Sequence, residues 1–306
     1  MKRFSALLNA ALVAGFFLAA CSNPPPLATT VAPTFTDLPA PTLANPTAVA
    51  SPTVRVEPSS SPTAISFTGM PVSFDRLSLV IPTGMAAGGI GTLVPEAKGD
   101  TVAPCDVAPE HIQLMLDGYA LEGKLHQPGI YVYPAQAYAQ LQERGAAAQS
   151  LERLQAVLAQ SSMVNIKELP SVPFLTVMPA LAAQVKVIPF QHGRGVRLVT
   201  EYAMGRAIIN NHELIYEFEG LTDDGKYYVT VLLPVNAPGL PEDGQPGSAM
   251  PPGGVLVPDF NDMNANWLAY YGDVRQMFQG LEPASFNPNL DQLDALIGSL
   301  DISTSN

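Results

Sequence analysis

Cys105 and Ser248 carry side chains of the types that act as nucleophiles, and the chain has four histidines that could serve as bases. No GxSxG pattern is present, and Ser248 lies in a Gly/Pro-rich stretch. Cys105 has no histidine near it in sequence, so a buried or loop thiol beside Pro104 is the simpler interpretation. A hydrolase-type site would have to be assembled through space, with Cys105, His192 or His212 among its residues.

Two stretches approach metal-binding motifs without completing them. His212-Glu213 begins an HExxH zinc motif, but Tyr216 stands where the second histidine must be, and the segment has the pattern of a strand. His111, His126, His192 and His212 as a set lack ligand spacing. We therefore expect no zinc, no other metal and no cofactor.

The second stretch approaches an EF-hand calcium loop. Asp262, Asn264 and Asn266, with Asp273 at the twelfth place, follow its ligand spacing. Trp267 occupies the position that requires glycine, and the stretch has a helical pattern. Asp and Asn side chains that cap a helix are the better explanation.

Charged side chains give two further ligand-contact candidates. The turn predicted at Gly193-Arg194-Gly195 could present Arg194 to an anionic ligand, with His192 and His212 as weaker candidates; a solvated turn is the alternative. Glu217, Glu219, Asp223 and Asp224 could hold a cation weakly, but we interpret them as a solvated acidic strand face.

The segment 184–235 is expected to position these groups as four antiparallel strands. Tyr216 and Phe218 alternate with Glu217 and Glu219, which is the two-residue period of a strand. Asp224-Gly225 is a hairpin signal. Pro189 cannot donate a ladder hydrogen bond, so its strand is placed at an edge or at a bulge.

The remaining segments from residue 65 predict a single α+β domain at 65–306, with the antiparallel meander at 184–235 packed against a few helices. Strands are expected within 70–84, 111–121 and 129–134, and a plain loop at 84–92. Helices are expected at 134–160, where Gly145 could interrupt the helix, and within 261–281 and 286–300, the last capped by Asn287 or Asn289.

The first 64 residues have a different composition. Lys2 and Arg3 precede an apolar run that is too short to span a bilayer and ends in Leu18-Ala19-Ala20-Cys21. This end resembles the lipobox of bacterial lipoproteins, which implies a signal peptide at 1–20 and fatty acyl chains on Cys21. An ordinary secretory signal with an accidental cysteine is the alternative. Residues 22–64 hold ten prolines and only three charges, which predicts a disordered stalk.

The charge balance argues against two kinds of partner, nucleic acid and anionic lipid. Residues 65–306 keep 12 of the 15 basic and 25 of the 27 acidic residues. Such an acidic domain is not expected to bind nucleic acid or to dock on anionic lipid by charge. Membrane attachment is therefore assigned to Cys21.

Two resemblances extend beyond the lipobox. The stretches FQHGRGVRLVTEYA and LIYEFEGLTDDGKYYVTVLLPV are similar to a group of uncharacterised bacterial lipoproteins, which implies an envelope location and no particular chemistry. The early strand ending in Ile81-Pro82-Thr83-Gly84, the antiparallel sheet and the closing helix resemble the PsbP/Mog1-like α+β fold. That likeness concerns shape alone.

Together these observations favour a non-enzymatic, lipid-anchored domain on the cell membrane, facing outside the cytoplasm. It would act as a binding or accessory module for another envelope protein or a small ligand. An extracytoplasmic hydrolase with a site assembled through space and a structural spacer remain the alternatives. A shallow or apolar groove would favour binding, a deep pocket with nucleophile, histidine and carboxylate would favour the hydrolase, and a spacer would have no pocket.

Overall fold

The computed structural model describes residues 67–141, 145–159, 166–175, 177–245 and 247–303. The chain divides into two units, Met1–Ser61 and Pro62–Asn306, and every described residue belongs to the second. The predicted signal peptide at 1–20, Cys21 and the predicted stalk at 22–64 lie outside the described residues.

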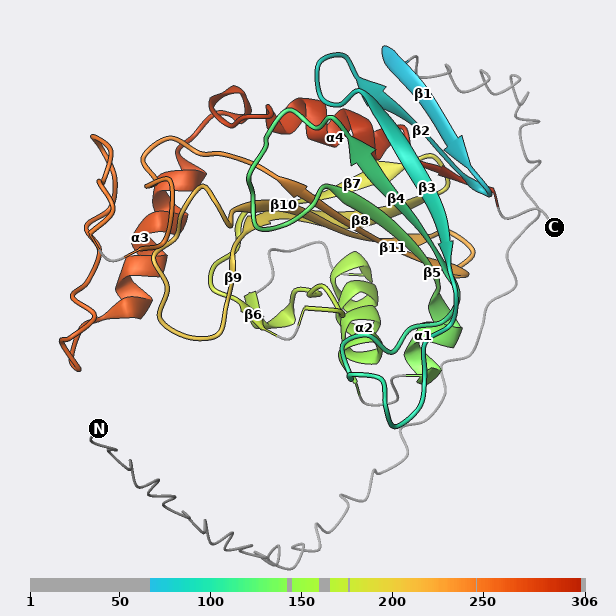
Figure 1. Ribbon diagram of the computed structural model, residues 1–306, viewed down its shortest axis with the longest axis horizontal. Helices are drawn as coiled ribbons and strands as arrows, with labels where there is room; N and C mark the ends of the chain where they lie inside the picture. Colours follow the sequence, from blue (N-terminus) through green and yellow to red (C-terminus); the bar gives the residue numbers. More distant parts are fainter. Residues whose placement is uncertain (1–66, 142–144, 160–165, 176, 246, 304–306) are drawn as a thin grey trace, which may run out of the picture. The chain divides into compact units, whose positions relative to one another are not determined.

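A seven-stranded antiparallel sheet forms the centre of the described chain (Figure 1). Its strand order is β3-β4-β5-β11-β10-β8-β7. The strands are β3 (Gly88–Val94), β4 (His111–Asp117), β5 (Gly129–Pro134), β7 (Ala183–Phe190), β8 (Gly193–Thr200), β10 (Ile215–Thr222) and β11 (Tyr227–Pro234). The predicted meander is confirmed as four successive neighbours, and β7, which contains Pro189, is an edge strand.

Two smaller sheets complete the strand set. One contains β1 (Gly69–Phe74), β2 (Leu77–Pro82) and β12 (Asp301–Ile302), and the other pairs β6 (Met178–Pro179) with β9 (Tyr202–Ala203). The single strand expected near 70–84 is therefore a hairpin. Its turn contains Asp75 at a φ of 53°, a conformation that Asp tolerates better than most residues.

Helices cover both faces of the large sheet, which gives the predicted α+β architecture (Figure 1). α1 (Ala135–Leu141) and α2 (Ala146–Ala159) contact β5, β8 and β10 on one face. α3 (Trp267–Gln279) and α4 (Leu290–Gly298) contact β7 on the other. Short 3₁₀ turns, η1 and η2, occupy Ile166–Glu168 and Pro283–Ser285.

The two faces of β10 carry different chemistry. Tyr216 and Phe218 belong to the main hydrophobic core beneath α3 and α4. Glu217 and Glu219 alternate with them and point to the opposite face. Both carboxylates are completely buried, at 0% exposure. The interpretation of this face as solvated is therefore wrong, because the α1/α2 side of the sheet is also covered by helices.

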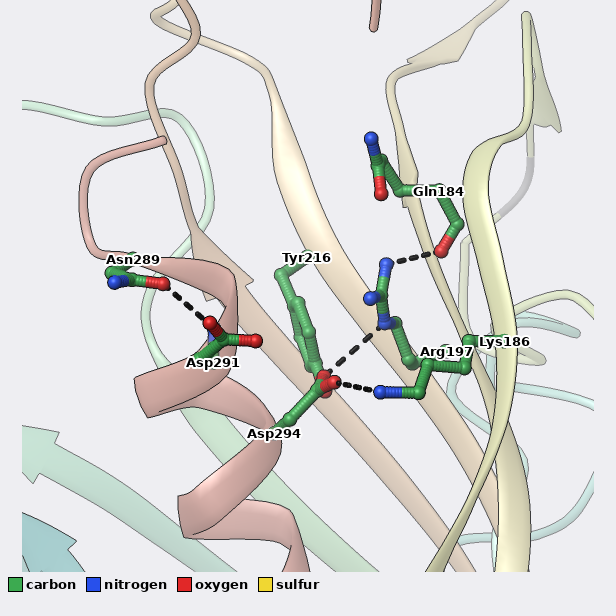
Figure 2. A network of polar contacts seen from close by, with 7 residues as sticks. All are labelled: Gln184, Lys186, Arg197, Tyr216, Asn289, Asp291 and Asp294. Atoms are coloured by element: carbon green, nitrogen blue, oxygen red, sulfur yellow. Dashed lines mark hydrogen bonds and ion pairs between the residues drawn. The ribbon is translucent and has the colours of Figure 1, made fainter. Parts of the chain in front are cut away.

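A buried ion pair ties α4 to the sheet (Figure 2). Arg197 of β8 lies 3.2 Å from the Asp294 carboxylate of α4, and Lys186 of β7 lies 3.1 Å from it. Tyr216 donates its hydroxyl to the same carboxylate at 2.9 Å. Asn289 caps the start of α4 by accepting the Asp291 amide at 2.8 Å, as the sequence predicts. The helix is thus positioned by its cap and by one central carboxylate.

Glycines in β3 and β8 explain two predictions that are wrong. The turn expected at Gly193–Gly195 and the plain loop expected at 84–92 each contain strand residues. A Cβ on Gly195 would stand 2.5 Å from the Phe218 ring, and a Cβ on Gly91 would stand 2.1 Å from the Phe74 ring. These glycines therefore leave room for a neighbouring aromatic ring, and they do not turn the chain.

Candidate binding site

The three sequence-predicted contact residues do not form one site. His192 lies in the two-residue turn between β7 and β8, with its Nε2 3.7 Å from an Asp301 carboxylate oxygen. Arg194 follows as an exposed residue of β8. Gly193 is in register with Thr222 at the end of β10, whereas His212 precedes the start of β10. At about 3.4 Å per residue, the length of β10 separates His212 from the other two by roughly 20 Å or more.

Neither possible nucleophile hydrogen-bonds to a histidine. His212 is nevertheless close enough to Asp243, the partner of Ser248, to add to the lowering of the pKa of Asp243 that the Ser248 hydrogen bond mainly causes. The Cys105 thiol lies 3.7 Å from Asp106 Oδ1, and the Ser248 hydroxyl donates to the Asp243 carboxylate. Between residues that the structure describes, no Ser, Thr or Cys side chain hydrogen-bonds to a histidine ring. The hydrogen bonds among the described residues therefore include no nucleophile–histidine pair.

The EF-hand-like stretch caps a helix. Asn266 accepts the Ala269 amide at 3.0 Å and is the N-cap of α3, and Asp262 accepts the Asn264 amide at 2.8 Å. Across the described residues, no cluster of three or more His, Cys, Asp or Glu side chains could hold a metal ion.

The two glutamates of β10, Glu217 and Glu219, are buried on the same face of the sheet. Tyr202 donates to Glu217 at 3.0 Å, and Thr230 donates to Glu219 at 2.9 Å. Burial raises the pKa of Glu217 to about 8 and that of Glu219 well above its ordinary value, where the neighbouring Glu217 adds to the rise. Tyr228, beside Glu219, donates its hydroxyl to Ser150 of α2 at 3.0 Å. Because both carboxylates are completely buried, we assign the pair to the structure of the α1/α2 face.

The most unusual surface lies at the α3 end of the sheet. Four apolar side chains are almost fully exposed there: Met204 at 95%, Leu256 at 87%, Leu268 at 83% and Met263 at 81%. Every other large apolar side chain described as exposed is at 60% or less. We call these four residues, together with a hollow that Leu256 helps to line, the α3 surface.

Contacts between the supporting segments bring three of the four residues, Met204, Met263 and Leu268, close to one another. The Arg206 guanidinium lies within 3.5 Å of the carbonyl oxygens of Asp262 and Met263, which places the Met204 loop beside Met263. Tyr271, one turn after Leu268 on α3, donates to the Gly205 carbonyl at 3.3 Å. Figure 1 shows the loop that precedes α3 running along the outer side of that helix.

An aromatic cluster forms the base of this surface. Trp267, the only tryptophan of the chain, is 6% exposed. Its ring centre lies 4.6 Å from that of Phe260 and 5.7 Å from that of Tyr270. The Trp267 Nε1 donor is buried and has no hydrogen-bond partner among the described residues. An unpaired buried donor costs roughly 1–3 kcal/mol.

A hollow of about 320 Å³ opens beside the cluster. Leu256 and Phe260 line it together with Ile208 and Met250, and Ser248 and Asp259 contribute polar atoms. Most of its lining side chains are apolar, and it is at the small end of the size range for ligand pockets. The hollow is suited to an apolar side chain or a small apolar group.

A polar network holds the floor of the hollow against α3. Tyr270 and Tyr271 accept the backbone amides of Ile209 and Ala207 at 3.0 and 2.9 Å. The buried Glu201 carboxylate accepts the Asn210 amide at 2.9 Å. Burial raises the pKa of Glu201 to about 9, against the opposing effect of that hydrogen bond. These contacts hold residues 207–210, and with them the lining residue Ile208, against α3 and Glu201.

The sequence analysis does not identify the α3 surface, although the helical spacing of α3 contains information about the exposure of Leu268. Trp267, Tyr270, Val274 and Phe278 repeat with helical spacing and form the buried stripe of α3. Leu268 falls off that stripe, and an apolar residue there could have been recognised as exposed. Met204 and Leu256 lie in irregular loops, where the sequence has no periodic pattern from which the exposure of a side chain could be predicted.

Comparison with known proteins adds no family: no protein-family model, curated protein or solved structure matches the chain. Over the residues that the structure describes, no helix has the length and apolar character needed to cross a membrane.

Proposed function

We propose that the chain is a lipid-anchored binding or accessory module of the bacterial envelope, and that it binds through the α3 surface. The observation that carries this proposal is a group of four apolar side chains, each more than four-fifths exposed, on the start of α3 and its neighbouring loops. One of them, Leu256, lines the hollow. Single exposed apolar residues are ordinary, but a group on one surface is typical of an interaction site. Methionine, which supplies two of the four, adapts to differently shaped partners.

The anchoring half of the proposal rests on the N-terminal sequence. Leu18-Ala19-Ala20-Cys21 and the preceding apolar run support lipidation of Cys21 and a position on the cell membrane, facing outside the cytoplasm. Two or more acyl chains hold a protein on a membrane stably, where one would not. The domain would then act on other envelope components from a fixed attachment point.

The geometry supports binding over the two alternatives. A hydrolase of the kind considered above needs a nucleophile within hydrogen-bond reach of a histidine base, and the described Ser248 and Cys105 side chains contact carboxylates. A simple spacer has no reason to maintain a hollow above an aromatic cluster. A small, largely apolar hollow is the feature that a binding module requires.

Site-specific photo-crosslinking in the producing cell tests the proposal. A benzophenone amino acid replaces Leu268 in the full chain, and Ile90 on the edge strand β3, 60% exposed, receives it in a matched control. We expect a discrete cross-linked product from position 268 and none from position 90, with loss of the product in the Cys21→Ala variant. No product from position 268, or the same product from both positions, would contradict binding at the α3 surface.

A further inference from the structure

The rim of the α3 surface is acidic. The segments that build it, 203–207 and 239–272, carry four carboxylates and one guanidinium. These are Glu242, Asp243, Asp259, Asp262 and Arg206, all exposed. Asp259 is also one of the residues that line the hollow. An apolar centre with a negative rim is complementary to an apolar segment that carries positive charge.

This charge distribution selects among possible occupants. An anionic bilayer would be repelled by the rim, and a second copy of this acidic chain would bring the same sign of charge. A basic amphipathic segment would place apolar side chains on Met204, Met263 and Leu268 and its cations against the rim. Flexible methionine-containing surfaces bind such helices by accepting apolar anchors spaced along one face.

The hollow and the unpaired Trp267 donor also match a peptide. The hollow, about 320 Å³, has room for one large apolar anchor side chain. The Trp267 ring packs against the Phe260 ring, which lines the hollow, and the buried Trp267 Nε1 donor has no acceptor among the described residues. A peptide carries a carbonyl acceptor at every residue, so a segment that displaces the Phe260 ring can supply the missing partner.

We propose that the α3 surface docks a basic amphipathic peptide segment of a protein partner, with one apolar side chain in the hollow and basic side chains against Asp259 and Asp262. This inference rests on the proposed binding function and deepens it by assigning the class of partner. Asp259 and Asp262 each accept a local backbone amide through Oδ1, at 2.9 and 2.8 Å. Asparagine keeps that acceptor and removes only the charge, which provides matched variants.

The test uses the fluorescence of Trp267, because this residue is the only tryptophan in the chain. The purified full chain, in phosphatidylcholine nanodiscs, is titrated with a tryptophan-free Leu/Lys peptide of helical spacing and with its Leu/Glu counterpart. We expect the basic peptide to bind at least about tenfold more tightly, and its affinity to fall with added salt. The double variant Asp259→Asn, Asp262→Asn should bind it about 2- to 10-fold more weakly, whereas Ile90→Ser should leave binding unchanged.

Several results would overturn the inference. Equal affinity for the two peptides, or an unaltered affinity in the double Asn variant, would remove the role of the rim. A fluorescence change with phosphatidylglycerol nanodiscs alone would assign the surface to a membrane, and a change that depends only on protein concentration would assign it to a second copy. If position 268 cross-links a partner but no peptide preference is found, only this inference fails; if neither is found, the binding function fails with it.

Discussion

Glu201→Gln is expected to make the protein's stability less dependent on pH. Glu201 is fully buried, and burial raises the pKa of its carboxyl to about 9. One of its oxygens accepts two hydrogen bonds from Asn210, and the other has no partner among the described residues. Glutamine has the same shape as the protonated acid that this site holds, so the substitution removes the titration and keeps the Asn210 contact.

The sign and size of the expected change in unfolding free energy follow from the linkage between proton binding and folding. An acid whose pKa is raised in the folded state contributes full stability below the unfolded pKa, near 4.3, and loses it as the pH rises toward the folded pKa. The loss is about 1.4 kcal/mol per pH unit for one group, so it is at most about 4 kcal/mol between pH 5 and pH 8. Local relaxation and water entry reduce this value. The Gln variant should therefore be close to the wild type at pH 5 and more stable than it at pH 8.

Urea unfolding of the full chain at pH 5, 6, 7 and 8 measures the effect. The quantity of interest is the difference in unfolding free energy between Glu201→Gln and the wild type, with the exposed Glu110→Gln as the control. The difference should grow with pH for position 201 and stay flat for position 110. A difference at position 201 that does not change with pH would refute the claim that this carboxyl stays protonated in the folded protein.

Five further substitutions test how α3 and α4 are held in the fold. Asp294→Asn leaves the buried Arg197 without its carboxylate and should lower the unfolding free energy by about 3 kcal/mol in urea melts. Asn289→Ala removes the α4 N-cap and should cost about 1 kcal/mol, whereas Asn289→Ser should recover most of it. Phe278→Ala, at a side chain with 0% exposure, should cost about 3–5 kcal/mol, while Leu268→Ala on the same helix should change stability by less than about 0.5 kcal/mol. A large loss for Leu268→Ala would mean that this side chain packs on the fold and is not free to bind a partner.

Local signals were sufficient for much of the fold. Alternation in 214–234 and the Asp224-Gly225 turn predict β10 and β11, and the sequence narrows the cap of the last helix to Asn287 or Asn289, of which the structure uses Asn289. The glycines at 84–92 and 193–195 wrongly indicate a loop and a turn, because the sequence does not show which side chains pack against them. Gly91 and Gly195 lie in strands, and glycine is needed there because Phe74 and Phe218 occupy the space that a side chain would take.

The candidate site was less accessible to sequence reasoning for a similar reason. The acidic face of β10 looked solvated because carboxylates are rarely buried, and only the tertiary structure shows α1 and α2 over it. The α3 surface combines a short loop around Met204 with a loop and helix start more than 50 residues later. Exposure in such loops depends on long-range contacts, and a local sequence pattern does not encode it.

Cysteine footprinting in intact cells tests the central claim most directly. Leu268→Cys and Ile90→Cys are placed separately in a Cys105→Ala background and treated with a membrane-impermeant maleimide, in cells and after purification. The account predicts that position 90 is labelled in both conditions, and that position 268 is labelled in the purified chain and protected in cells. Equal labelling of position 268 in both conditions would show that nothing occupies the α3 surface, and failure to label position 90 in cells would contradict a location outside the cytoplasm.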